Sequence, residues 1–140
     1  MELDDAERIR DRADHLDAGD PLRRMAAYRL ALGLVGDAWT DAEKVRAHPT
    51  TSFIASQLYR AASSIGANIA EGYSRSSGKD RVRLFEYALG STRECRFWYH
   101  AARFVLDPRD YEQRSFVLTR ICKILLVAIP RERGREIRKS

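Results

Sequence analysis

Arginine supplies most of the chemistry that this sequence offers. Only four of its 25 basic residues are lysine, so guanidinium groups dominate. A guanidinium binds phosphate through two parallel hydrogen bonds and stacks on planar rings. Seven basic side chains follow one another through a predicted turn and the helix after it, a spacing that suits contact with a phosphate backbone. They are Arg75, Lys79, Arg81, Arg83, Arg93, Arg96 and Arg103.

The same seven residues also fit a solvated charged face held by local ion pairs, and the sequence leaves both interpretations open. A GC-rich genome would produce the same bias toward arginine. The sequence contains no RNA-recognition or helix-turn-helix signature that would read bases. Binding of nucleic acid through these residues would therefore depend on charge and shape and not on base sequence.

Asn68 and Glu71 form a second candidate site, because they place polar groups beside a run of small apolar residues. In the functional interpretation they are a ligand-binding or catalytic pair. In the structural interpretation Asn68 bridges helices by hydrogen bonds, and Glu71 pairs with Arg75 one helical turn later. We favour the structural interpretation, since a buried polar group without a partner costs about 1–3 kcal/mol.

Catalytic and metal-binding constellations are missing from the sequence. The three histidines, His15, His48 and His100, lie in different predicted elements with no partner at ligand spacing. Di-metal helical bundles need inward-facing Glu-x-x-His pairs, and no glycine-rich phosphate loop follows a strand. No serine, cysteine and histidine form a nucleophile pair. We therefore expect a protein that is not an enzyme and that uses no metal or cofactor.

Charge is distributed unevenly along the chain. Residues 1–20 carry three Arg against eight Asp and Glu, a net −5, whereas residues 21–140 carry 22 basic against 12 acidic groups, a net +10. A basic body attracts polyanions, and the acidic arm competes for the same surface. Cys95 and Cys122 sit at apolar helical positions as free thiols, which indicates a reducing compartment. With no signal peptide and no membrane-length apolar run, we expect a cytoplasmic protein.

Helical periodicity runs through the first half of the chain. Asp20 and Pro21 predict the cap and first residue of a helix that ends near Ala47. A second helix follows Thr50, Thr51 and Ser52 as candidate caps and stops at Gly72. The predicted inner stripe of the first helix is Leu22, Met25, Tyr28, Leu32, Val35 and Trp39. That of the second is Ile54, Leu58, Ala61, Ile65 and Ile69, surrounded by small residues that permit close packing.

Two further helices complete the pattern. Ser77 and Asp80 resemble a capping box for a third helix that runs to about Leu106, and Asp107-Pro108 begins a fourth that Pro130 should end or kink. The third helix has inner positions at Phe85, Ala88, Thr92, Cys95, Tyr99, Ala102 and Leu106. The fourth has a stripe of Tyr111, Leu118, Ile121, Leu125 and Ala128.

These elements predict an all-α fold, an antiparallel up-down-up-down four-helix bundle over residues 21–129. An acidic arm, residues 1–20, precedes the bundle, and a basic tail, residues 130–140, follows it. Tyr87, Phe97, Trp98 and Phe104 lie outside the inner stripe of the third helix. Because exposed aromatic residues commonly mark interfaces, we expect this helix to pack against another subunit.

The run from Arg60 to Gly72, RAASSIGANIAEG, followed by Arg75 and by Phe85-x-x-Ala-Leu-Gly-Ser91 with Glu94, resembles the bacterial rRNA intervening-sequence protein family over residues 22–128. The resemblance implies a cytosolic four-helix bundle, often a homopentamer. Related bundles are accessory variability proteins of diversity-generating retroelements, in which a basic pentamer engages a reverse transcriptase and nucleic acid. The matching motif positions, to which we assign roles in folding and assembly, are Arg60, Asn68, Glu71, Gly72, Arg75, Gly90, Ser91 and Glu94.

The sequence thus favours a homo-oligomeric accessory protein without enzymatic activity that binds nucleic acid, RNA in particular, through its arginines. The alternative is a scaffold that docks a protein partner, such as a reverse transcriptase, without touching nucleic acid.

Overall fold

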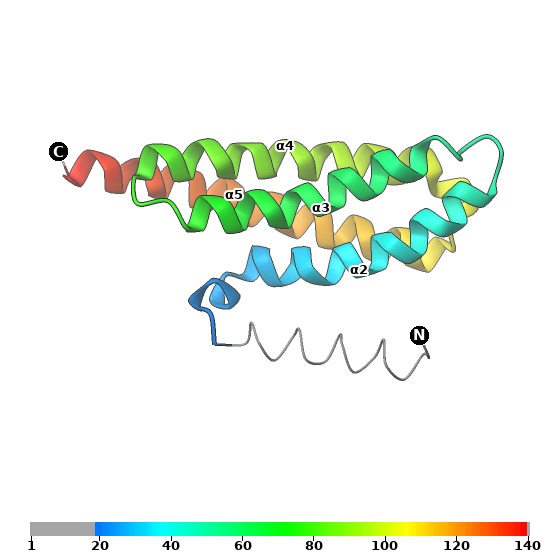
Figure 1. The fold of residues 1–140 in the computed structure, drawn as a ribbon, viewed down its shortest axis with the longest axis horizontal. Helices are drawn as coiled ribbons and strands as arrows, with labels where there is room; N and C mark the ends of the chain where they lie inside the picture. Colours follow the sequence, from blue (N-terminus) through cyan, green and yellow to red (C-terminus); the bar gives the residue numbers. More distant parts are fainter. Residues whose placement is uncertain (1–18, 140) are drawn as a thin grey trace.

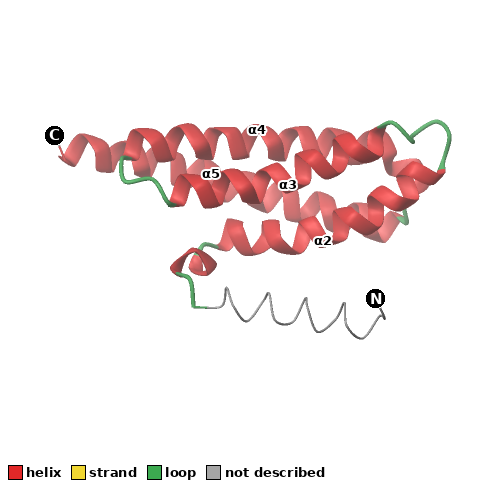
Figure 2. Ribbon diagram, viewed as in Figure 1, coloured by secondary structure: helices red, strands yellow, loops and turns green. Residues whose placement is uncertain are grey.

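The computed structural model describes residues 19–139, and their side chains as far as Gly134. Two 3-10 turns, η1 (Pro21–Arg24) and η2 (Arg103–Val105), accompany four long helices. The helices are α2 (Ala26–Ala47), α3 (Ile54–Tyr73), α4 (Gly78–Ala102) and α5 (Pro108–Lys139), and they run alternately up and down the bundle (Figure 1). No strand occurs between residues 19 and 139 (Figure 2), which confirms the all-α prediction. Nearly all of the predicted arm lies outside the described residues.

The first helix begins later than predicted. Asp20 accepts a hydrogen bond from the Leu22 backbone N–H at 2.9 Å, so it caps the turn η1 rather than α2. Met25 then adopts an extended conformation, with φ −76° and ψ 115°, and α2 starts at Ala26. Asp20 and Pro21 thus act as the cap and first residue of a helical segment, as predicted, but that segment is the turn η1. The extended residue after that entry separates the turn from the helix.

The predicted inner stripe of α2 is wrong beyond Leu22. Met25, Tyr28, Leu32 and Val35 are only partly buried, and 58% of Trp39 is exposed. The buried face of α2 consists of Ala27, Ala31, Leu34, Ala38, Asp41, Ala42 and Val45. Small side chains let α2 approach α3 closely: a Cβ on Gly66 would lie 3.5 Å from the Cβ of Ala31. The larger residues therefore flank the contact.

The inner stripe of α3 is buried as predicted, but its ends differ from the prediction. No side chain caps its first turn, because Thr51 Oγ1 donates to the Val45 carbonyl at 2.8 Å and so closes the α2–α3 connection instead. At the other end α3 continues past Gly72 to Tyr73. Gly72 is required for packing, since a Cβ there would meet the Phe85 ring at 2.9 Å.

Helices α4 and α5 begin as predicted, but α4 ends at Ala102 instead of near Leu106, and the turn η2 follows it. Ser77 accepts from the Asp80 backbone N–H at 3.2 Å, and Asp107 accepts from that of Arg109 at 2.8 Å. All seven predicted inner positions from Phe85 to Leu106 are buried. In α5, Leu118, Ile121 and Leu125 are buried, but Ile129 replaces Ala128 as the last core residue.

Pro130 was expected to end or kink the last helix, and it does not end it, because α5 continues to Lys139. Pro130 is exposed, and so is Leu126, whose carbonyl loses its helical N–H partner. Water can take the place of that donor on an exposed side, so the proline is tolerated. None of the described helices has the length and apolar character needed to cross a membrane.

Candidate nucleic-acid interface

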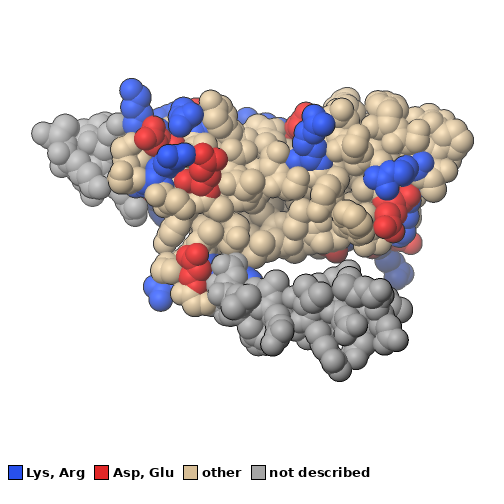
Figure 3. Space-filling view, viewed as in Figure 1, with Lys and Arg blue, Asp and Glu red and all other residues tan. Residues whose placement is uncertain are grey.

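The seven predicted basic residues do not form one patch. Arg75, Lys79, Arg81 and Arg83 lie around the start of α4, whereas Arg93, Arg96 and Arg103 lie in its second half or just after it. At a rise of about 1.5 Å per residue, Arg83 and Arg93 lie about 15 Å apart along the helix axis, so the two groups are separated along the bundle. On the face seen in Figure 3, basic and acidic side chains lie in small mixed groups with uncharged surface between them.

The group at the start of α4 is largely engaged in ion pairs. Arg75 pairs with Glu71 at 2.7 Å, as predicted. Arg81 contacts Glu132 of α5 at 2.7 Å, with only 14% of its side chain exposed, and donates to the Arg75 carbonyl at 2.6 Å. Arg83 lies 4.0 Å from Asp80. We therefore assign Arg81 to the fold. Lys79 is the member of this group without a partner among the described residues.

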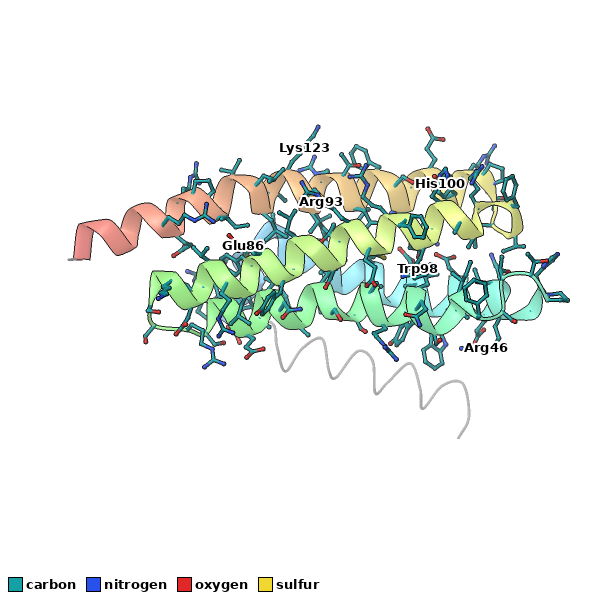
Figure 4. The ribbon with its side chains drawn as sticks, turned by 90° about the horizontal axis from the view of Figure 1, so that it is seen from above. Arg46, Glu86, Arg93, Trp98, His100 and Lys123 are labelled. Atoms are coloured by element: carbon teal, nitrogen blue, oxygen red, sulfur yellow. The ribbon has the colours of Figure 1, made fainter. Side chains whose placement is uncertain are left out.

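Two members of the second group, Arg93 and Arg96, line a groove of about 530 Å³ between α4 and α5. Its walls are Arg93, Arg96, Phe97 and His100 of α4 with Tyr111 and Ser115 of α5. Figure 4 shows Arg93 and His100 along the edge of α4 that faces α5. We call this the basic groove.

The polar groups at one end of the basic groove are linked to one another. His100 Nδ1 lies 3.4 Å from the Tyr111 hydroxyl, and Arg103 Nη1 lies 3.2 Å from His100 Nε2. Arg103 also donates to the His100 carbonyl at 2.8 Å and stacks over Phe104, 4.1 Å from its ring centroid. These contacts hold the imidazole and phenol at the mouth of the groove, where either can contact an anion.

Arg93 and Arg96 provide the positive charge of the basic groove. Neither side chain hydrogen-bonds or pairs with another residue in the described part of the chain. Phe97 beside them is 60% exposed and contacts Trp98 edge-to-face, with ring centroids 5.2 Å apart. Two open guanidinium groups next to an exposed ring suit a phosphate with an adjoining base.

Comparison with known proteins places the fold in a family. Residues 23–126, about three quarters of the chain, match the family described as 23S rRNA-intervening sequence protein. The chain belongs to this family. A solved structure of a protein of unknown function from the S23 ribosomal protein family, from Bacteroides thetaiotaomicron, has the same fold with a TM-score of 0.68. At 22% identity, the alignment covers 74% of this chain and 98% of that one. No curated protein matches.

The family match covers the motif positions from Arg60 to Glu94, and the structure separates their roles. Asn68 donates to the Ser64 carbonyl at 2.9 Å within its own helix, and it makes no hydrogen bond to another helix among the described residues. Glu71 is half-exposed in its pair with Arg75. Gly90 and Glu94 are exposed and Ser91 is partly buried on α4. The motif thus brings together no buried catalytic pair.

A buried polar network in the core of this family member escaped the sequence analysis. Asp41 of α2 is 0% exposed and accepts from the Tyr99 hydroxyl at 2.7 Å and from Arg114 Nε at 2.8 Å. Arg114 Nη2 lies 3.3 Å from the other Asp41 oxygen, and Nη1 lies 3.6 Å from Asp37. The network joins α2, α4 and α5. The recurring alanines at 27, 31, 38 and 42 were the signal that could have placed Asp41 inside.

The protonation states in this network are fixed by burial and by Asp41. Burial and the hydrogen bond to Asp41 raise the pKa of Tyr99, so the phenol stays protonated. Burial opposes the charged form of Arg114, but the hydrogen bond and attraction to Asp41 outweigh it and raise the pKa of the guanidinium. Both groups serve the fold. The described residues hold no group of three His, Cys, Asp or Glu side chains able to bind a metal ion.

Proposed function

We propose that this chain is a homo-oligomeric accessory protein, without enzymatic activity, that binds RNA electrostatically through the basic groove. The observation that carries the proposal is the pair Arg93 and Arg96, which line a groove of about 530 Å³ and have no acidic partner among the described residues. Arg81 and Arg83 of α4 lie beside carboxylates, whereas these two arginines are open and lie together in one groove. A net charge of +10 over residues 21–140 draws a polyanion toward the bundle.

The test measures fluorescence anisotropy of a labelled single-stranded RNA at a series of salt concentrations. Wild-type protein should lose affinity steeply as salt rises, because binding releases counterions. Replacing both arginines, Arg93→Gln with Arg96→Gln, should weaken binding and reduce the log–log salt slope by about 1.4, the value for two lost phosphate contacts on a single strand. Absence of binding by wild type at low salt would reject the proposal.

A matched control removes the same charge elsewhere. Arg24 lies at the end of η1, and Arg120 lies on α5 with its guanidinium 5.9 Å from the Phe116 ring centroid. Neither residue lines the basic groove. The double change Arg24→Gln with Arg120→Gln should leave most of the affinity intact. Equal losses in the two double variants would mean that only net charge matters, and the groove assignment would be wrong.

Oligomer formation is the second part of the proposal. Phe104 is 80% exposed and Phe97 and Tyr87 are more than half exposed, all on α4 or just after it. Large exposed rings support an interface between subunits. Sedimentation at micromolar concentration should give a mass several times 16.0 kDa. A monomer would contradict this part.

A protein-interaction scaffold is the second candidate, and it is favoured by the same exposed rings. The partner would be a protein such as a reverse transcriptase. Under this alternative the complex formed with a defined partner survives nuclease treatment, and the change Arg93→Gln with Arg96→Gln leaves it intact.

A further inference from the structure

A second groove, of about 390 Å³, lies between α2 and α3. Residues at i, i+4 and i+7 of α2 line one wall, and residues spaced by one helical turn of α3 line the other. They are Trp39, Ala42, Glu43 and Arg46 with Ser56, Tyr59, Arg60 and Ser63. The volume falls in the range of small-ligand sites. None of these residues belongs to the basic groove, and we call this the aromatic groove.

The aromatic groove has an exposed ring of fixed orientation. Trp39 and Tyr59 meet edge-to-face, with centroids 5.5 Å apart and ring planes at 79°. This contact leaves 58% of Trp39 exposed. A tryptophan held by one neighbour and open on a face is a stacking platform for another planar group.

The charged groups of the aromatic groove are open as well. Glu43 and Arg46 are separated by three positions on α2, a spacing at which opposite charges commonly pair, yet they form no ion pair. Arg60 on the facing helix likewise has no side-chain partner in the described part of the chain. Ser63 donates to the Tyr59 carbonyl at 2.8 Å and so is held by its own helix. Two cations and one acceptor thus surround the exposed ring.

We propose that the aromatic groove binds one nucleotide of a single-stranded RNA, with the base stacked on Trp39 and the phosphates on Arg46 and Arg60. This inference rests on the proposed function and adds the site at which a base is held. Bases of single strands are recognised in this way, by aromatic stacking and by hydrogen bonds to their edges. The second half of α2 and the first half of α3 place the groove at the same end of the bundle as His100, on other helices.

Glu43 gives this site a base preference. An ionised carboxylate only accepts hydrogen bonds, so it favours a base with an exocyclic amino group. Cytosine offers its N4 amino group to such an acceptor, whereas uracil presents a carbonyl oxygen at the same position. The groove therefore binds cytidine more tightly than uridine. Glu43→Gln, whose amide both donates and accepts, removes most of that difference.

The experiment uses the full chain with Trp98→Phe, which leaves Trp39 as the only tryptophan. Single-stranded oligocytidine should quench Trp39 fluorescence and oligouridine should quench it less. In the unmodified background, Trp39→Leu should weaken oligocytidine binding at least about fivefold, the lower end of the stacking contribution of one base. Arg46→Gln with Arg60→Gln should weaken it as well, and it keeps the test valid if Trp39→Leu fails to fold.

The matched control is Phe53→Leu. Phe53 is 65% exposed at the start of α3, but it does not line the groove. Its replacement should leave affinity within twofold of wild type, and circular dichroism should show every variant folded.

The outcomes separate the two proposals. If RNA binds but leaves Trp39 fluorescence unchanged and the groove variants bind normally, the nucleotide site is overturned and the proposed function stands. If Trp39→Leu weakens binding while Arg93→Gln with Arg96→Gln does not, the nucleotide site stands and the basic groove is overturned. If wild type binds no RNA at low salt, both are overturned.

Discussion

Removing the Asp41 carboxylate tests the tertiary structure most directly. Asp41 lies at the point where α2 meets α4 and α5, with 0% of its surface exposed. Its two oxygens accept from the Tyr99 hydroxyl and from two nitrogens of Arg114, at 2.7, 2.8 and 3.3 Å. Asp41→Ala removes all three bonds at once. It leaves a buried guanidinium and a buried phenol without their acceptor.

The magnitude follows from these contacts. Removing one partner of a buried ion pair costs about 3–5 kcal/mol, because the other charge stays buried. Arg114 retains Asp37 at 3.6 Å, but that carboxylate is 44% exposed, so solvent weakens its attraction for the guanidinium. We therefore expect Asp41→Ala to lower the free energy of unfolding by about 3 kcal/mol, the lower end of that range. This figure includes the cost of leaving the Tyr99 hydroxyl without an acceptor. For a chain of 140 residues this lowers Tm by roughly 10 °C.

Urea denaturation followed by circular dichroism measures the change. Asp110→Ala provides the control, since Asp110 is 40% exposed and pairs loosely with Lys44 at 3.8 Å. That change should cost less than about 1 kcal/mol. A cost below about 1 kcal/mol for Asp41→Ala would refute the reasoning, because it would show that Asp41 is not buried against Arg114. Adding Arg114→Met to Asp41→Ala should restore part of the lost stability.

Two further predictions concern packing and pH. Gly72→Ala should lower the free energy of unfolding by about 1–3 kcal/mol, because the new Cβ would clash with the Phe85 ring. The control Gly36→Ala adds a Cβ in open space and should raise the free energy of unfolding by up to about 1 kcal/mol. Equal effects of the two changes in urea melts would contradict this prediction. Burial raises the pKa of the Cys95 thiol from 9.0 to about 12, so the folded state holds this proton where the unfolded state has lost it, and stability should fall as pH rises from about 9 toward 12. Cys95→Ala should reduce that fall in urea melts at pH 8 and 10, and an unchanged fall would contradict the assignment.

The inner face of α4 could be predicted because its period is regular and its side chains are large. Phe85, Cys95 and Tyr99 recur at regular helical spacing along this helix. The caps Ser77 and Asp107 could also be predicted, because each accepts a hydrogen bond from a backbone N–H two or three residues later. Arg75 with Glu71 is a third local contact. Interactions between residues within about four positions of each other can be predicted from the sequence alone.

The inner face of α2 could not be predicted by hydrophobicity alone. Its large apolar residues, Tyr28, Leu32 and Val35, lie beside the contact, while alanines fill it. Which of two neighbouring stripes faces inward depends on how closely α3 approaches, and Gly66 and its small neighbours set that distance. Asp41 was missed for the same reason, because it lies on the alanine face.

The candidate binding surface was predicted in its residue types but not in its grouping. Arg93 and Arg96 line a groove, whereas Arg81 is tied to Glu132, 51 positions away. An ion pair between α4 and α5 depends on the register of the two helices. Likewise, Trp39 and Arg60 belong to different helices, and only their packing forms the aromatic groove.

The sequence by itself determined the helical fold, the number of long helices, the caps of α4 and α5 and the family, because period and capping are properties of neighbouring residues. The tertiary structure alone decided which face of α2 is buried, which arginines are paired and which are open, and where the grooves lie. Those outcomes depend on distances between helices far apart in the chain, and side-chain volume at each contact sets those distances.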